Sequence, residues 1–221
     1  MKKLQNSLML IFLSFYFIAC ASTQDINLIK EKAELGNKES QYKLGRYYQY
    51  NKKDLTKAFE LYKQSAKQNY SVAQNELGNF YLEGKGITKD YEKAFYWYEK
   101  ASKSYYFDAI NNLGYMYDLG LGRKEDNEKA LQLYEDAASK GSIRAMYNVG
   151  FLYKNGQGTS KNIIQAYKWF ELARYYTSTS KNMTLKWSIR KQLDTLKTIM
   201  TKQEIDEVEE LANQWNKSIR K

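Results

Sequence analysis

The chain has 221 residues, and its 35 Lys and Arg against 25 Asp and Glu give a formal net charge of +10. It contains no His and one Cys, which excludes catalytic sites built on an imidazole base, imidazole metal sites, intrachain disulfides and multi-cysteine zinc sites. It also contains no Pro and 12 Gly, which argues against a turn-rich all-β fold and allows long helices.

The N-terminal residues are typical of a secretory signal. Lys2 and Lys3 are followed by a mostly apolar run at residues 8–19. This run is about a dozen residues long, whereas a helix needs roughly 20 residues to cross a bilayer. A short apolar run behind basic residues at the start of a chain indicates a segment that is removed on export.

The apolar run ends at a candidate lipidation site. The sequence Phe17-Ile18-Ala19-Cys20 resembles the lipobox of bacterial lipoproteins, in which a small residue precedes the Cys that is acylated. The resemblance implies a lipoprotein signal peptide at residues 1–19 and acyl chains on Cys20 that hold the chain at a membrane. Because Ala21 follows the Cys where an Asp would favour the inner membrane, it also implies an outer-membrane location facing the periplasm. An ordinary signal peptide followed by an unmodified Cys is the alternative.

A repeat with a period of 36 residues organises most of the remaining chain. One column of the repeat holds an Ala: Ala58, Ala94, Ala130 and Ala166. An aromatic residue follows each Ala by four positions: Tyr62, Tyr98, Tyr134 and Phe170. A Gly lies further upstream, with a Tyr three positions after it: Gly45 and Tyr48, Gly78 and Tyr81, Gly114 and Tyr117, Gly150 and Tyr153. Such self-similarity predicts stacked supersecondary units.

Each repeat is predicted to be a helix, a Gly-containing turn and a second helix. The turn carries a pair of Gly residues in every repeat but the first. Asp90 and Asp126, each four residues before the repeated Ala, are predicted to cap the second helix. A Gly that recurs inside the first helix implies that another helix passes too close for a Cβ, and we expect the repeated Ala to be its contact. Both Tyr columns are expected to belong to the core.

These columns resemble the Sel-one-like repeat, a relative of the tetratricopeptide repeat, over four copies at residues 33–176. The resemblance implies an all-α fold, a right-handed α-solenoid of helix-turn-helix repeats. Residues 20–32 would form the lipidated N-terminus and a capping helix, and residues 177–221 a C-terminal helical cap. In that cap we expect a loop at 177–180 and a helix at 181–199. A last helix should start near Lys202, because Thr201 and Glu204 have capping-box spacing.

An α-solenoid offers a concave groove that is lined by the first helix of each repeat and binds peptides or proteins. The residue after the repeated Gly varies between repeats, as expected of a position that does not pack. Asn and aromatic side chains at and near this position suit recognition of a peptide backbone or of a sugar. The predicted partner-binding residues are Arg46, Asn75, Asn79, Asn111, Asn112, Tyr115, Tyr147, Asn148 and Phe151. A merely solvated helix face is the alternative for each of them.

The sequence therefore predicts a membrane-anchored scaffold that binds a protein or peptide. It predicts no enzyme activity, no cofactor, no metal site and, because the positive charge is carried by scattered Lys, no nucleic-acid partner. One alternative is a cell-wall or polyanion binder that uses the positive charge. The other is a β-lactamase-like hydrolase, as proposed for cysteine-rich relatives of the repeat. Its Ser-x-x-Lys motif occurs as Ser40/Lys43, Ser178/Lys181, Ser188/Lys191 and Ser218/Lys221, but without the partner motifs Ser-Asp-Asn and Lys-Thr-Gly.

Overall fold

The structure is a computed structural model that describes residues 25–177 and 182–219. Within these ranges every regular element is a helix, as the sequence predicts. The predicted signal peptide, Cys20 and most of the loop expected at 177–180 lie outside the described residues. The chain forms two compact units, Met1–Lys89 and Asp90–Lys221, and each is described by itself.

The N-terminal unit holds the first three helices of the repeat region. Residues 25–34 are helical, where a capping helix is expected. They are followed by α2 (Lys38–Tyr47), the π-helical segment η1 (Tyr48–Lys52), α3 (Leu55–Lys67) and α4 (Ser71–Glu83). Helix α3 packs against both α2 and α4, so successive helices bury each other's apolar sides.

The segment η1 replaces the Gly pair that the first repeat lacks. It follows α2 without a break and ends at Lys53, which adopts a left-handed conformation with φ 56°. Its buried residue Gln49 accepts a hydrogen bond from the Tyr62 hydroxyl of α3 at 2.7 Å. The missing Gly pair indicates a different turn here, but the sequence does not indicate that the turn is π-helical.

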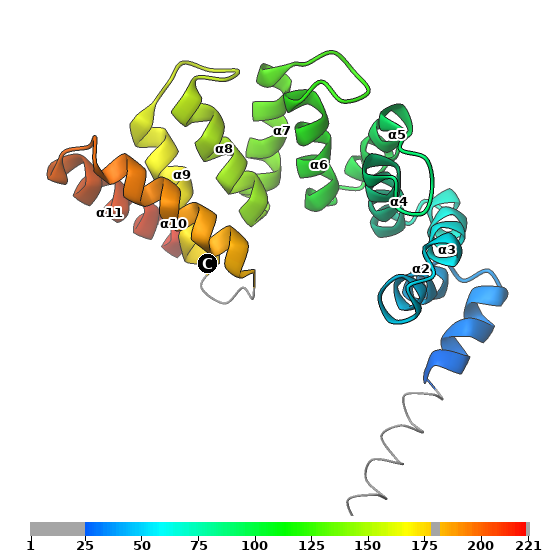
Figure 1. Cartoon of the computed structure of the whole chain (residues 1–221). Coiled ribbons are helices and arrows are strands. Elements are labelled where there is room, and N and C mark those ends of the chain that lie inside the picture. The colour runs from blue at the N-terminus through cyan, green and yellow to red at the C-terminus, as the bar shows by residue number, and fades with distance from the viewer. Residues whose placement is uncertain (1–24, 178–181, 220–221) are drawn as a thin grey trace, which may run out of the picture. The chain divides into compact units, whose positions relative to one another are not determined.

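The C-terminal unit continues the same arrangement through seven helices of the described residues (Figure 1). They are α5 (Tyr91–Ser102), α6 (Phe107–Asp118), α7 (Asn127–Ser139), α8 (Ile143–Asn155), α9 (Ile163–Tyr176), α10 (Met183–Lys197) and α11 (Lys202–Ile219). Each helix from α5 to α9 packs against the next, and α10 and α11 both pack against α9. The two terminal helices therefore cover the side of α9 that no further repeat covers.

The second helix of each repeat starts at a capped residue, as predicted. The side chains of four equivalent residues accept a hydrogen bond from the backbone N–H three positions later, at 2.8–3.0 Å: Asp54, Asp90, Asp126 and Asn162. These oxygens satisfy N–H groups that have no partner within the helix. The predicted capping box at Thr201 and Glu204 is also present and α11 begins at Lys202.

The repeated helical Gly makes room chiefly for an aromatic ring, and only secondly for the repeated Ala that the sequence suggests. A Cβ on Gly114 would lie 2.9 Å from the ring of Tyr134, and one on Gly45 or Gly150 would lie as close to Tyr62 or Phe170. The carbonyl oxygen of Ala130 is the next atom, at 3.4 Å from the Gly114 Cβ position. The expected close approach is therefore confirmed. The repeated Ala is in contact as expected, through its carbonyl oxygen, but the nearest group is the aromatic ring one helical turn later.

The two Tyr columns differ in burial, so the prediction that both are core holds for one of them. Tyr62, Tyr98 and Tyr134 of the second helices are fully buried. The first-helix column is only half-buried: Tyr48, Tyr81, Tyr117 and Tyr153. The hydroxyl of Tyr153, for example, donates to Glu135 Oε1 at 3.0 Å at the edge of the core.

Candidate partner-binding face

Two equivalent aromatic side chains of the C-terminal unit point away from its core. Tyr115 on α6 and Phe151 on α8 are 39% and 40% exposed. Each comes directly after a buried pair of residues, Leu113-Gly114 before Tyr115 and Val149-Gly150 before Phe151. Because successive helical residues are turned by about 100°, the residue after the Gly is carried away from the packed side. We call the exposed side of α6 and α8 around these two residues the first-helix face.

A hydrogen bond joins the two helices of this face. Asn148 on α8 donates from Nδ2 to Oδ1 of Asn111 on α6 at 3.1 Å, and Asn111 donates in turn to Oδ1 of Asn112 at 3.4 Å. Asn112 and Asn148 are half-buried, but Asn111 is only 5% exposed. The structure therefore gives Asn111 the role of holding α6 and α8 in register, in place of the predicted direct contact with a partner.

Tyr147 also belongs more to the packing than to the open face. It is half-buried, and its ring lies 5.5 Å from the ring of Phe170, centroid to centroid. Burial raises the pKa of its hydroxyl, so the hydroxyl stays protonated in neutral solution. Among the predicted residues of the C-terminal unit, Tyr115 and Phe151 are thus the two that offer a large accessible apolar surface.

The predicted residues of the N-terminal unit are less alike. Arg46 on α2 is exposed, with its guanidinium carbon 5.8 Å from the centre of the Tyr50 ring. Asn79 on α4 is half-buried and donates to Glu76 Oε2 at 3.3 Å. Asn75 is 4% exposed, so a direct contact with a partner is not supported for it. No exposed aromatic pair comparable with Tyr115 and Phe151 is formed by these predicted positions.

The C-terminal end of α6 carries a carboxylate with an altered acidity. Burial raises the pKa of Asp118 above its ordinary value, and a hydrogen bond from the Tyr134 hydroxyl, at 3.3 Å, partly opposes this. On the next first helix, Lys154 of α8 donates from Nζ to Gln192 Oε1 of α10 at 2.7 Å. Polar side chains thus link α6 to α7 and α8, and α8 to α10.

In the two Ser-x-x-Lys tetrads that the structure describes, the Lys side chain contacts a group other than the Ser. Ser40 is buried, and Lys43 is directed to Glu39, with 2.7 Å between Nζ and Oε1. Lys191 lies over the ring of Trp187. In the described part of the chain, His, Cys, Asp and Glu form no cluster that could hold a metal ion. Within the same residues, no helix has the length and apolarity needed to span a membrane.

The comparisons with known proteins agree with this architecture. The family model of the Sel1 repeat matches residues 38–70, 71–106, 107–142 and 143–174. The chain belongs to the Sel1 repeat family. Sel1 repeat proteins are generally protein-interaction scaffolds, and the family is generally non-enzymatic. The matched repeats start at α2 and end within α9, so α10 and α11 lie outside them.

Two solved Sel1 structures are similar to this chain. A Sel1 repeat protein from Oxalobacter formigenes is 30% identical, with a TM-score of 0.58 over 64% of this chain and 59% of its own. The protein c5321, a protective antigen of uropathogenic Escherichia coli with the same repeat fold, is 26% identical, with a TM-score of 0.52 over 87% of this chain and 48% of its own. This chain thus spans about half to three fifths of their lengths. No curated protein matches significantly.

Proposed function

We propose that this Sel1 repeat chain is a scaffold that binds a protein or peptide on the first-helix face of its C-terminal unit. The observation that carries the proposal is the pair of exposed aromatic residues, Tyr115 and Phe151, at equivalent positions of consecutive repeats. Aromatic side chains bury a large area on binding and lose little side-chain freedom, so they often dominate the binding energy of an interface.

The surroundings of the two aromatic residues support a face of fixed shape. The hydrogen bond between Asn148 and Asn111 links the helices that carry them, and the Gly beside each aromatic residue is packed against a buried ring. A partner would therefore meet two side chains whose separation is set before binding, which reduces the entropy lost on association. Asn112 and Asn148, which are half-buried on the same two helices, each have further donor and acceptor capacity beyond their bonds to Asn111 and can bind a peptide backbone.

We further propose that the chain acts at a membrane of the bacterial envelope, facing the periplasm. The support is the sequence around Cys20, which resembles a lipobox behind a short apolar run. Two or three acyl chains bind a protein to a bilayer far more firmly than one chain does. A scaffold held in this way would keep its partner close to the membrane surface.

Photocrosslinking in living cells tests the binding face. A photoreactive amino acid is placed at position 115 or 151, and at Gln132, an exposed position on the second helix α7, as the matched control. We expect one crosslinked partner from both 115 and 151 and none from 132. Replacing the other aromatic residue, as Phe151→Ala in the chain labelled at 115, should reduce the yield. Equal yields from 132, or no crosslink at 115 and 151, would contradict the proposal.

The membrane anchor is tested separately by Cys20→Ser. The wild-type chain should incorporate labelled fatty acid and sediment with membranes, whereas the variant should do neither. A variant that still sediments with membranes in high salt would show that Cys20 is not the anchor. This outcome would leave the binding face unaffected, because the two proposals rest on different residues.

A further inference from the structure

The aromatic column of the first-helix face continues beyond the Sel1 repeats that the family model matches. Trp187 lies on α10, 36 residues after Phe151, which itself lies 36 residues after Tyr115. It is 63% exposed, more than either of the other two. The match to the family ends at residue 174, so nothing in the repeat family assigns this helix a place in the binding face.

Helix α10 also packs as a first helix does. It lies against α9, the second helix of the preceding repeat, as α8 lies against α7. Ile189 is buried and Leu185 packs against the same core, and these residues follow Tyr153 and Val149 of α8 by 36 positions. Trp187 is turned by about 200° from the buried Ile189, so it lies on the side of α10 away from its core, as Phe151 lies on the side of α8 away from its core.

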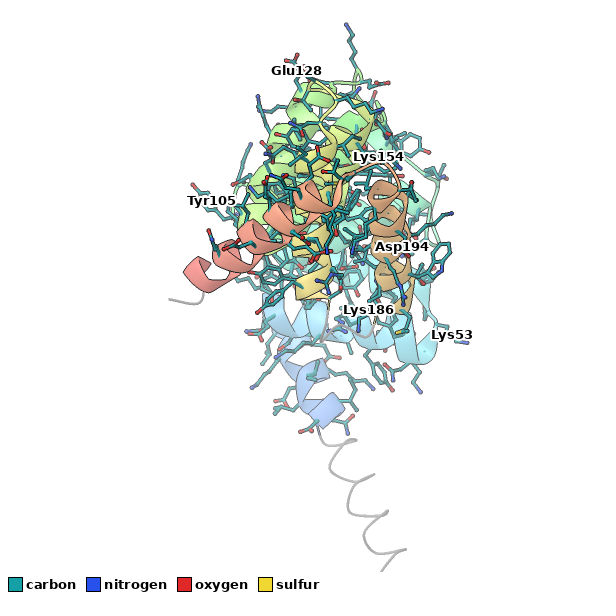
Figure 2. All side chains as sticks on the ribbon, turned by 90° about the vertical axis from the view of Figure 1, so that its left-hand side faces the viewer. Lys53, Tyr105, Glu128, Lys154, Lys186 and Asp194 are labelled. Atoms are coloured by element: carbon teal, nitrogen blue, oxygen red, sulfur yellow. The ribbon has the colours of Figure 1, made fainter. Side chains whose placement is uncertain are left out.

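A direct side-chain contact places α10 next to the first-helix face. Lys154 of α8 donates to Gln192 of α10 at 2.7 Å. Figure 2 labels Lys154, and also Lys186 and Asp194 of α10. Helix α10 is therefore a direct neighbour of α8, the helix that carries Phe151.

The charges around Trp187 select the kind of partner. The Lys191 ammonium lies 5.2 Å from the centre of the Trp187 ring. Both line a shallow concavity with Arg190 and Asp194, and Arg190 Nε lies 3.9 Å from Asp194 Oδ2, so Lys191 is the cation in excess there. An aromatic platform edged by a cation favours an apolar or aromatic side chain flanked by carboxylates.

We propose that α10 is the first helix of a degenerate fifth repeat, and that Trp187 anchors an acidic, extended segment of the partner that carries apolar side chains. The proposal rests on the function proposed above and extends its face from two repeats to three. Helices that pack against each other lie about 8–10 Å apart. A segment in the extended polyproline II conformation advances about 3.1 Å per residue with three residues per turn, so side chains at every third position project from the same side of it. An aromatic side chain at every third position of such a segment would therefore meet successive members of the column.

Fluorescence anisotropy with the full-length chain and labelled synthetic peptides tests the proposal. The probe carries Phe at every third position between Glu and Ser residues; one control peptide has Lys in place of Glu, and the other has Ala in place of Phe. We expect binding of the first peptide alone, weakening as salt rises. Trp187→Ala should weaken it about tenfold or more, and Lys191→Glu should weaken it while leaving the ring in place.

Ile199→Ala is the matched control, because Ile199 is also exposed but lies outside the column. It should bind as the wild type does, and thermal unfolding should show that Trp187→Ala and Lys191→Glu remain folded. Unchanged binding by Trp187→Ala, or equal binding of the Lys peptide, would overturn the proposal. If the Trp187→Ala chain binds the peptide normally but the double variant Tyr115→Ala/Phe151→Ala does not, α10 is not part of the binding face. The proposed function on α6 and α8 then still stands. If only Trp187→Ala fails to bind, the proposed face on α6 and α8 is wrong.

Discussion

Asn148 on α8 donates a hydrogen bond to Asn111 on α6, about one repeat earlier along the chain, at 3.1 Å. Asn111 is nearly inaccessible to solvent, so its Oδ1 depends on this bond. An unpaired buried acceptor costs about 1–3 kcal/mol. We therefore expect Asn148→Ala to lower the free energy of unfolding by about 1–2 kcal/mol, measured by urea denaturation.

A double-mutant cycle separates this bond from other effects at either residue. Asn111→Ala combined with Asn148→Ala should cost less than the sum of the two single changes, with a coupling of at least about 0.5 kcal/mol. Asn155→Ala, at an exposed position of the same helix α8, is the control and should change stability by less than about 0.5 kcal/mol. Strict additivity of the two Asn changes would mean that the bond does not link the helices.

Gly114→Ala provides a second prediction. Helix propensity alone predicts that the change stabilises the chain, whereas packing predicts that it destabilises the chain. Ala is favoured over Gly inside a helix by about 1 kcal/mol. A Cβ at this position, however, would lie 2.9 Å from the buried ring of Tyr134. Overpacking of this kind costs about 1–3 kcal/mol, so Gly114→Ala should destabilise the chain in thermal unfolding.

The ring is the cause if its removal abolishes the effect. In a Tyr134→Leu background, Gly114→Ala should cost less than in the wild type, because the clash is relieved and the gain in helix propensity remains. An equal loss in both backgrounds would point instead to the Ala130 carbonyl oxygen, which lies 3.4 Å from the position that the added methyl group would occupy. That result would make the Ala130 carbonyl, the contact expected from the sequence, the one that limits the space at Gly114.

The sequence predicts the repeat and its helix boundaries well, because these follow from local chemistry. Asp126 caps α7 through its own side chain and the next three residues, and the capping box at Thr201 needs no other part of the chain. The partner of Gly114 could not be predicted in the same way. The ring that lies against Gly114 belongs to Tyr134, 20 positions later in the chain. The packing angle between the two helices decides which residue of the second helix lies against Gly114.

The candidate face is predicted less completely than the fold. Tyr115 and Phe151 are accessible as expected, because the residue after a packed Gly turns outward. Asn75 and Asn111 are buried instead. Each lies one helical turn before the residue that follows the repeated Gly, and the burial of that position depends on how closely the neighbouring helix packs, which the sequence does not show. Trp187 is not among the predicted residues, although it lies 36 residues after Phe151. The repeated Gly and Ala columns end before α10, so the sequence does not mark this helix as part of the repeat.

The π-helical segment of the first repeat gives a third prediction. The buried Tyr62 hydroxyl donates to Gln49 Oε1 at 2.7 Å, and burial raises its pKa, so it remains a donor. Gln49→Ala leaves this hydroxyl without that acceptor and should cost about 1–3 kcal/mol. Tyr62→Phe in the same chain should recover part of the loss, because the orphaned hydroxyl is then gone. Denaturation curves of the two single variants and the double variant provide the comparison, and a double variant as unstable as the sum of both changes would contradict it.

The capping box of α11 makes stability depend on pH in a defined direction. The backbone N–H of Thr201 donates to Glu204 Oε2 at 2.7 Å, and its hydroxyl donates to the same oxygen at 2.9 Å. These bonds, the backbone one first, hold the pKa of the Glu204 carboxyl below its ordinary value of 4.5. Because the pKa is lower in the folded chain, the stabilisation is fully present above the unfolded-state pKa and is lost as pH falls through the folded-state pKa.

Glu204→Gln isolates this contribution, because Gln keeps a capping oxygen but does not titrate. The stability advantage of the wild type over Glu204→Gln should be constant near neutral pH and should shrink as the pH falls below 4.5. An NMR titration of the carboxyl carbon gives the cause directly. In Thr201→Ala the hydroxyl bond is lost and the backbone bond remains, so the pKa of Glu204 should rise part of the way to its ordinary value. If the pKa of Glu204 does not move, the Thr201 hydroxyl contributes nothing to lowering it, and the backbone N–H alone is responsible.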